Sequence, residues 1–256
     1  MRDTKIYYSK KIKPKAPVMI VGLPGIGNVG SLVGEHIRAE LGGVRFASLY
    51  SAHFPHHVVM MKNGMARPVS NRFYYIKRTG KMKSDLVILV GDFQAISPEG
   101  QYEVNEKIVR FFKKIGGERI YTIGGYSTSQ GYVQHPKVFG VASSKKLVGE
   151  LKAKGIVFGK AQGLIMGSAG LIVTMARKNH VDAACVMGET GMLEVDANSA
   201  KAVIDVMKNI LHLDLDLKNI EKIKSETDKM LKSMMEAQAN QEQGPPPNKD
   251  VMSYIR

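Results

Sequence analysis

The sequence has a single cysteine, no long hydrophobic run and no apolar signal region near its start. One cysteine, Cys185, excludes an internal disulfide and is typical of a reducing compartment. No apolar stretch approaches the ~20 residues that a membrane-spanning helix needs. The first residues, Met-Arg-Asp-Thr-Lys-Ile, do not resemble a secretion signal. We therefore expect a cytoplasmic protein with no membrane partner.

Acidic residues are missing from one long stretch. No Asp or Glu occurs over residues 41–84, which contain eight Lys and Arg residues, and the whole chain has a formal net charge of +14. Such a stretch can bind nucleic acid or another acidic partner, or it can be a solvated basic face. No aromatic RNA-binding motif, zinc-finger spacing or helix-turn-helix signature accompanies it. The solvated face is the favoured interpretation, and nucleic acid binding is kept as the alternative.

The sequence contains enough apolar material for a large core. Hydrophobic residues make up 44% of its 256 residues, which suits one α/β domain with an appendage. The expected parts are a basic lead-in over 1–15, an α/β core over 16–213, an amphipathic helix over 214–243, and a proline-rich spacer and tail over 244–256. The predicted helix has the three- and four-residue spacing of a weak coiled-coil seam, which favours packing on a partner subunit or on the domain.

Buried strands and amphipathic helices alternate through the core. Strands are predicted at 18–21, 45–51, 86–90, 119–123, 138–142 and 181–187, and helices at 29–41, 97–115, 144–154, 168–179 and, after a cap at Asp196 or Asn198, up to Leu211. This alternation predicts an α/β fold with a mostly parallel sheet covered by helices on both faces. In such sheets the turns after the strands meet at one edge, where ligands usually bind.

An antiparallel excursion is predicted within the basic stretch. Segments 58–61 and 72–77 have strand composition, and Lys62-Asn63-Gly64 between them contains the Asn-Gly pair that is typical of hairpin turns. We therefore expect these two segments to form a hairpin.

The most distinctive motif is the turn Gly22-Leu-Pro-Gly-Ile-Gly-Asn-Val-Gly30 between the first strand and the first helix. The free N–H groups and the dipole of a helix N-terminus favour anions. The alternative is a tight strand-to-helix connection in which glycine only allows close packing. The candidate residues of an anion- or ligand-binding turn are Gly25, Ile26, Gly27, Asn28 and Gly30.

Two nucleotide-binding interpretations of this turn lack their other residues. Residues 25–30 match the dinucleotide fingerprint Gly-x-Gly-x-x-Gly, but the end of the next strand, at 47–53, has no acid for the ribose and no basic residue for a 2′-phosphate. A Walker loop needs Lys and then Ser or Thr after its last glycine, whereas Ser31 and Leu32 follow Gly30. We predict no cofactor.

A metal site and a hydrolase site are both incomplete. His53, His56 and His57 with Asp92 lack a recognised ligand spacing, so hydrogen-bonded loop histidines are favoured over a metal. Residues 127–129, Ser-Thr-Ser, with His135 do not contain a nucleophile elbow. Cys185 lies within an apolar run and is interpreted as a core residue. No catalytic residue is therefore predicted.

Later glycine-rich turns supply secondary candidates for the same crevice. These candidates are Gly124, Gly125, Glu189 and Thr190. Glu189 is the best single carboxylate, although it can equally cap a turn or pair with a basic residue. A small-molecule or nucleotide-binding enzyme or sensor that uses this crevice is therefore one functional hypothesis.

A different hypothesis comes from a resemblance to a known family. The turn at 22–30, which contains Pro24 and Asn28, and Gly188-Glu-Thr-Gly-Met-Leu-Glu-Val-Asp196 are similar to the archaeal branch of the proteasome assembly chaperone family. The resemblance extends over about residues 15–212. It implies a three-layer α/β/α sandwich like that of nucleoside phosphorylases but without their catalytic set. It also implies an ATP-independent chaperone or adaptor, not an enzyme, that forms a homo-oligomer or pairs with a related chain and binds proteasome α-subunits.

The C-terminus also resembles this family. Members that bind the proteasome core end in a hydrophobic residue, a tyrosine and any residue, and this ending enters pockets between ring subunits. The present chain ends in Tyr254, Ile255 and Arg256, so its tyrosine stands one position earlier than in the family pattern. A stiff spacer, Pro245-Pro-Pro247, precedes the tail. We expect a partner-docking tail, with an unstructured terminus as the alternative.

Overall fold

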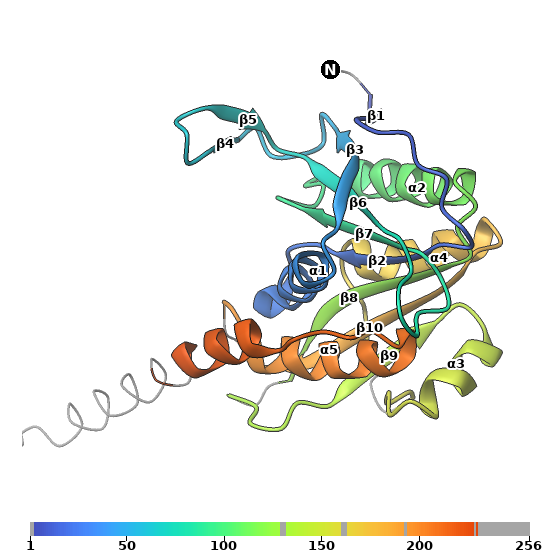
Figure 1. Cartoon of the computed structure of the whole chain (residues 1–256), viewed down its shortest axis with the longest axis vertical. Coiled ribbons are helices and arrows are strands. Elements are labelled where there is room, and N and C mark those ends of the chain that lie inside the picture. Colours follow the sequence, from blue (N-terminus) through green and yellow to red (C-terminus); the bar gives the residue numbers. More distant parts are fainter. Residues whose placement is uncertain (1–2, 129–131, 160–162, 192–193, 228, 230–256) are drawn as a thin grey trace, which may run out of the picture.

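The computed structural model describes residues 3–128, 132–159, 163–191, 194–227 and 229. One eight-stranded sheet crosses the molecule in the order β1-β3-β6-β7-β2-β8-β10-β9 (Figure 1). Its strands are β1 (Lys5–Tyr8), β2 (Val18–Gly22), β3 (Val44–Tyr50), β6 (Asn71–Ile76), β7 (Leu86–Gly91), β8 (Arg119–Ser127), β9 (Val138–Ala142) and β10 (Asp182–Thr190). A separate hairpin consists of β4 (Val58–Met60) and β5 (Ala66–Pro68).

Five of the eight strands run in one direction. The central strands β7, β2, β8 and β10 are successive parallel neighbours. Strand β3 has the same direction because it is antiparallel to β6, which is antiparallel to β7. Strands β1, β6 and β9 run the opposite way. The predicted α/β class with a mostly parallel sheet is confirmed.

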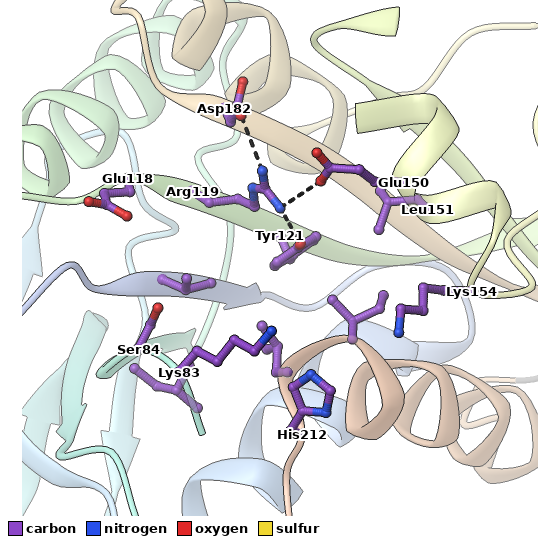
Figure 2. Close-up of a pocket in the computed structure, with 14 residues that line it drawn as sticks. Lys83, Ser84, Glu118, Arg119, Tyr121, Glu150, Leu151, Lys154, Asp182 and His212 are labelled. Carbon is purple, nitrogen blue, oxygen red and sulfur yellow. Dashed lines mark hydrogen bonds and ion pairs between the residues drawn. The ribbon is translucent and has the colours of Figure 1, made fainter. Parts of the chain in front are cut away.

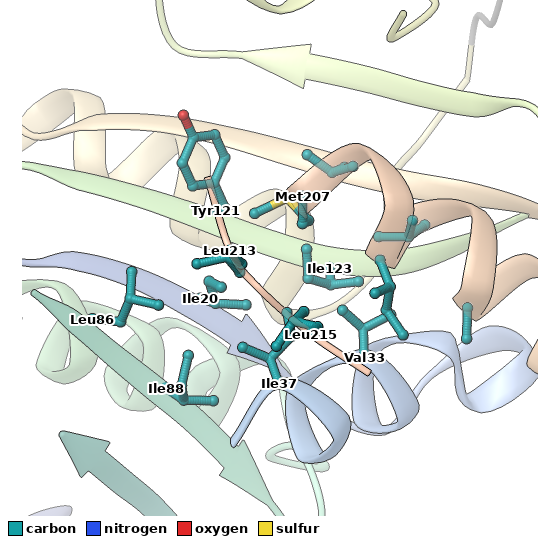
Figure 3. Packing of buried hydrophobic residues seen from close by; sticks show 14 of the residues in the cluster. Ile20, Val33, Ile37, Leu86, Ile88, Tyr121, Ile123, Met207, Leu213 and Leu215 are labelled. Carbon is teal, nitrogen blue, oxygen red and sulfur yellow. The ribbon is translucent and has the colours of Figure 1, made fainter. Parts of the chain in front are cut away.

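Helices cover both faces of the sheet. One face carries α1 (Val29–Glu40), α3 (Lys145–Lys152) and α5 (Ala197–Leu211), and the other carries α2 (Pro98–Lys114) and α4 (Ser168–Lys178) (Figure 1). Each face has its own apolar cluster, and Figure 3 shows the α1–α5 side. Successive side chains of a strand point to opposite faces, so the central strands β2 and β7 are apolar along their length. The three-layer arrangement is confirmed.

Side-chain caps begin three of the helices. A cap satisfies an N–H group that has no partner inside the helix, and this favours Ser and Asp at that position. The caps are Ser97, Ser144 and Asp196, whose side-chain oxygens accept the N–H groups of Gly100, Leu147 and Ser199 at 3.0, 3.3 and 2.8 Å. Local sequence therefore places these helix starts correctly.

Two segments differ from the prediction. Lys5–Tyr8, in the predicted lead-in, is the edge strand β1 and pairs with β3. The turn at Asn63-Gly64 does form a hairpin, but Val58–Met60 pairs with Ala66–Pro68. Segment Asn71–Ile76 lies in the main sheet between β3 and β7 instead. The expected pairing was wrong because the true partner, the three residues Ala66–Pro68, is short, contains proline and lacks strand composition.

The chain continues past α5 across the α1 face of the core. Leu213, Leu215 and Ile220 are buried in the same cluster as Ile37 (Figure 3). Residues 218–227 are helical, within the helix predicted over 214–243. Apart from residue 229, the remainder of that helix, the spacer and the tail lie outside the described residues. Within the described residues, no helix is long and apolar enough to cross a bilayer.

This packing predicts that Leu215→Ala destabilises the whole domain. Leu215 is only 5% exposed, and removing a buried leucine side chain usually costs about 2–5 kcal/mol because a cavity is left. We expect a loss of about 2–3 kcal/mol in the free energy of unfolding, measured with guanidinium chloride. Leu164→Ala, at a side chain that is 96% exposed, is the control and should change stability by less than about 0.5 kcal/mol. Equal effects of the two substitutions would show that the segment after α5 does not stabilise the core.

Candidate functional site

A crevice lies at the carboxyl ends of β2 and β8, where α4 begins. Its volume is about 400 Å³. Gly25 and Ile26 from the glycine turn, Gly124 and Gly125 from β8, and residues 164–167 before α4 all line it. The sequence-based expectation that the glycine-rich segments meet at one edge is therefore met by these three segments.

The lining of this crevice is mostly apolar. Among the described residues that line it, none is Asp, Glu, His, Lys, Arg or Cys. Its polar side chains are those of Gln94, Thr122, Tyr126, Ser127 and Ser168. Such a surface suits apolar side chains or an apolar ligand, and it offers no carboxylate or imidazole for acid–base chemistry.

The glycines of the 22–30 turn are needed for close packing. Gly27 and Asn28 have left-handed backbone conformations, with φ of 61° and 49°. Gly30 is buried at the start of α1, and a Cβ there would lie 2.5 Å from the carbonyl oxygen of Leu23 and 2.8 Å from that of Ile123. Gly27, Asn28 and Gly30 do not line the crevice, because α1 lies directly against the ends of β2 and β8.

Backbone N–H groups that an anion would need at this turn already donate to carbonyl oxygens of the protein. The N–H of Asn28 donates to the carbonyl oxygen of Gly25 at 2.9 Å, and the N–H of Val29 donates to that of Ile26. This single 3₁₀ turn (Ile26–Asn28) therefore satisfies groups that would otherwise be free at the helix start.

At the beginning of α4, the side chain of Gln94 accepts a backbone N–H group that would otherwise be free. Its Oε1 accepts the N–H of Ser168 at 2.8 Å, and its Nε2 donates to the carbonyl oxygen of Pro24 at 2.6 Å. One amide side chain thus caps a helix and ties it to the glycine turn. Sequence reasoning did not find Gln94, since no local pattern connects it to residues about 70 positions away.

The secondary candidates lie in strands and not in turns. Strand β8 continues through Gly124 and Gly125, and β10 continues through Glu189 to Thr190. A Cβ at Gly125 would collide with the carbonyl oxygen of Ile26, so this glycine also serves close packing. The predicted strand ends were too early because glycine is a weak strand former but is required where another backbone approaches.

Glu189 and Thr190 are engaged in structural hydrogen bonds and do not line the crevice. The Oε2 of Glu189 accepts the N–H of Lys137 at 3.0 Å, which ties β10 to the segment before β9. The buried hydroxyl of Thr190 donates to Oδ2 of Asp196 at 2.6 Å. Asp196 in turn caps α5, so Thr190 positions that cap.

Exposed apolar side chains surround the crevice. Leu164 and Met166 are 96% and 81% exposed, and Ile26 is 46% exposed. We call these three residues, which all line the crevice, the apolar rim. Contiguous exposed apolar surface around a cleft is typical of protein–protein or ligand contact.

A second apolar surface lies on the β4–β5 hairpin, which projects from the body of the domain (Figure 1). Its residues Val58, Met60 and Met65 are at least 59% exposed. Unbranched methionine side chains adapt to irregular partners, so this arm also suits protein contact.

A charge cluster around Asp92 holds the base of this hairpin. Arg67 donates from both terminal nitrogens to the Asp92 carboxylate at 2.6 and 2.9 Å, Arg72 donates at 2.8 Å, and the N–H of Ser70 donates at 3.0 Å. Burial alone would raise the pKa of Asp92, but these hydrogen bonds outweigh it and lower the pKa to about 2. Asp92 is therefore a structural anchor.

The basic stretch is divided between two places in the structure. Arg67 and Arg72 are paired with Asp92. The exposed Lys62 lies in the hairpin turn, and the exposed Lys81 lies in the loop between β6 and β7, at the other end of β6. Arg45, Lys77, Arg78 and Lys83 are also exposed and lie with Lys81 at that end of β3 and β6, so a nucleic acid there would meet five of the eight cations of the stretch.

The loop histidines also have partners in the protein. Nε2 of His53 lies 3.1 Å from Oε2 of Glu103 at the start of α2. The ring of His57 contacts those of His56 and Phe93, at centroid distances of 5.4 and 5.6 Å. No group of His, Cys, Asp and Glu that could hold a metal occurs among the described residues.

The remaining reactive candidates are separated or buried. Ser127 lines the crevice, whereas His135 is exposed before β9, and no hydrogen bond joins the two among the described residues; Ser129 lies outside them. Burial raises the pKa of Cys185 to about 11, so its thiol stays protonated in the core. The predicted docking residues Tyr254, Ile255 and Arg256 lie outside the described residues.

A second cavity, of about 570 Å³, lies where the parallel strands β2, β7 and β8 begin, at the strand ends opposite the crevice. Arg119 forms ion pairs with Glu150 and Asp182 at 3.1 and 3.3 Å, and it contacts the hydroxyl of Tyr121 at 3.4 Å (Figure 2). Two carboxylates therefore compensate this guanidinium. No sequence motif indicated this cavity, because its residues come from elements far apart in the chain.

Known proteins with a similar sequence or structure are consistent with this architecture. The chain is 32% identical over 254 residues to the protein MJ1210 of Methanocaldococcus jannaschii, with 96% of each chain covered. It is similar in structure to Pyrococcus furiosus PbaB, described as an archaeal proteasome activator, with a TM-score of 0.86, 32% identity, and 92% of this chain and 100% of that chain covered.

A further structural relative shows the same fold at lower identity. Pyrococcus furiosus PbaA, described as an archaeal homologue of a proteasome-assembly chaperone, has a TM-score of 0.72 and 22% identity, with 94% of this chain and 97% of that chain covered. The model of the PAC2 family matches residues 19–237, which include every strand of the sheet except β1 and the first residue of β2, together with the glycine turn and helical residues 218–227. The chain belongs to the PAC2 family.

Proposed function

We propose that this protein is an ATP-independent chaperone or adaptor of the proteasome-assembly type that binds protein partners without catalysis. The apolar rim at the crevice carries the proposal, because its side chains are free to contact a partner while the described lining has no acid–base group. The similarity to PbaB supports it, since that protein of 32% identity is described as a proteasome activator.

The proposal includes the identity of the partners. The first partner is the proteasome core, through its α-subunits, and the second is another copy of this chain in a homo-oligomer or a related chaperone-like chain. The C-terminal residues Tyr254, Ile255 and Arg256 act as a docking tail behind the proline spacer. A cytoplasmic location follows from the nature of these partners and agrees with the single cysteine.

The rim is tested with the double substitution Leu164→Asp and Met166→Asp. Two charges in an apolar contact should weaken binding of cognate proteasome α-subunits at least about tenfold, as loss of central contact residues usually does. Isothermal calorimetry measures this on the full chain. Native mass spectrometry of the same samples gives the oligomer size, which distinguishes loss of self-association from loss of the proteasome contact.

Val44→Asp is the matched control, because Val44 is 47% exposed at the beginning of β3, far along the sheet from the rim. It should leave binding unchanged. Unchanged affinity of the rim variant would exclude the rim as a binding surface. A chain truncated after Gly244 tests the tail separately: equal binding with and without the tail would exclude its role, and no binding by the intact chain would exclude the proposed function.

The alternative is a sensor or enzyme for a small apolar molecule, which the crevice volume of about 400 Å³ favours. Thermal-shift screening with nucleosides, nucleotides, phosphate and apolar metabolites addresses it. A ligand that raises the melting temperature of the wild-type chain but not of the rim variant would support this alternative.

A further inference from the structure

The edge strand β1 is next to a groove. β1 is the last strand of the sheet, and its outer edge has no strand partner among the described residues. Helix α2 passes beside it, since the ring of Tyr8 packs on Phe111 at 5.5 Å and the N–H of Thr4 donates to Glu103 at 2.9 Å (Figure 1). A groove of about 430 Å³ lies between the two elements.

The walls of this groove are basic. Lys107 and Lys114 on α2 are exposed beside the groove, and Lys5 is exposed on the face of β1 that points away from α2; among the described residues no carboxylate pairs with any of the three. Of the acids on α2, Glu106 pairs with Arg110 at 2.7 Å and Glu103 accepts the N–H of Thr4, and one further acid, Asp3, is exposed just before β1. The groove therefore has an excess of positive charge along its length.

The strand beside the groove also presents exposed aromatic rings. Tyr7 and Tyr8 are each 52% exposed, on opposite faces of the strand. Tyr8 lies on the α2 side with Phe111, and Tyr7 contacts Tyr50 on the other side. Side chains of an added strand would therefore meet an aromatic ring on either face.

These features together indicate one kind of occupant. An unpaired strand edge presents alternating N–H and C=O groups, which an extended peptide can pair with and a nucleic acid backbone cannot. A second copy of this chain is disfavoured because pairing at β1 would bring its Lys5 and the lysines of its α2 close to these lysines, and charged residues are one way in which natural edge strands avoid self-pairing. A peptide with acidic side chains satisfies both the edge and the charge.

We propose that β1 and the flank of α2 bind an extended acidic segment of a partner protein, which adds to the sheet as a further strand beside β1. The backbone of β1 supplies the hydrogen bonds, and Lys5, Lys107 and Lys114 select acidic side chains. This site is separate from the apolar rim, so it does not depend on the proposed role of the rim or of the tail.

The probe is a fluorescent peptide of about eight residues that alternates Glu and Val, a length that covers a typical strand. Fluorescence anisotropy with the full chain should show saturable binding. A Lys-Val peptide should bind at least about tenfold more weakly, because its charges repel those of the groove. The Glu-Val peptide with N-methyl groups on alternate residues should also lose at least about tenfold, because it cannot donate to the strand edge.

The site is located by the double substitution Lys107→Glu and Lys114→Glu, which should weaken binding of the Glu-Val peptide at least about tenfold. Lys145→Glu with Lys146→Glu makes the same change in net charge on exposed residues of α3, close to the opposite edge of the sheet. This control should bind like the wild type. Circular dichroism and thermal unfolding check that both variants are folded.

Three results would overturn the proposal. The first is equal binding by the two double variants, and the second is equal binding of the methylated and unmethylated peptides. The third is tight binding of a single-stranded oligonucleotide to the groove with no binding of the acidic peptide, which would assign the groove to nucleic acid. None of these results depends on whether proteasome subunits bind.

Discussion

Gly30→Ala is expected to destabilise the protein by about 3 kcal/mol or more, a large share of the roughly 5–15 kcal/mol that keeps a typical domain folded. A Cβ at this position would lie 2.5 Å from the carbonyl oxygen of Leu23 and 2.8 Å from that of Ile123. Both obstacles are backbone atoms, one just after β2 and one in the middle of β8, so neither can move without shifting the sheet. The gain of about 1 kcal/mol that alanine gives in a helix is too small to compensate.

Gly25→Ala is the matched control within the same motif. Gly25 is exposed and has an extended backbone, with φ of −173°, and the nearest atom to a Cβ there is Nε2 of Gln94 at 3.8 Å. We expect a change of less than about 0.5 kcal/mol. Guanidinium denaturation followed by circular dichroism measures both variants. A Gly30→Ala protein as stable as the wild type would contradict the close-packing explanation of the turn.

Asp92→Asn is expected to lower the free energy of unfolding by about 2–3 kcal/mol at pH 7. The substitution removes a carboxylate that two arginines share, and a partly buried charge left without its partner is costly. Arg67 and Arg72 would then face each other across a neutral amide at the base of the hairpin. Asp205→Asn, in the more exposed pair with Lys201, is the control and should cost less than about 0.5 kcal/mol.

The same residue predicts a pH dependence. The pKa of Asp92 falls from 3.8 to about 2 on folding. A carboxyl group with a lowered folded-state pKa stabilises the protein above its unfolded-state pKa, and this contribution is lost as the pH falls from about 4 toward 2. The difference between the two pKa values corresponds to about 2 kcal/mol.

The stability difference between wild type and Asp92→Asn should therefore be largest at neutral pH and shrink by about 2 kcal/mol toward pH 2. Denaturation series at several pH values measure it, and subtracting the two proteins removes the contributions of other acids such as Asp85, whose pKa is also lowered. A difference that stays constant between pH 7 and pH 2 would show that the Asp92 carboxylate is not held by the arginines.

The strands and helix starts that could be predicted from the sequence depend on interactions between residues that are close in the chain. Strands β2 and β7 are continuous apolar runs because both of their faces are buried. Helices α2, α3 and α5 begin at Ser97, Ser144 and Asp196, because a cap needs only one side chain and the next few residues. The family resemblance also came from short motifs, and the match of the PAC2 model confirms it.

Candidate residues were predicted less well than elements. The 22–30 turn was located correctly, but the sequence could not distinguish a glycine that lets a ligand approach from one that lets a backbone approach. Gly25 is open to the crevice, whereas Gly30 packs against the backbone of Leu23, just after β2, and of Ile123 in β8. Both glycines belong to the same local sequence motif, and their roles differ only because different parts of the folded chain lie next to them.

By itself, therefore, the sequence determined the class of fold, the main strands and helices, the crevice at the strand ends and the family. These features depend on the hydrophobic period and on caps and turns, which act over a few residues. The tertiary structure alone decided the place of β6 between β3 and β7, the place of β1 at the sheet edge, the anchoring of the hairpin by Asp92, and the capping of α4 by Gln94. Each of these requires groups that are distant in the chain to meet, and no local pattern carries that information.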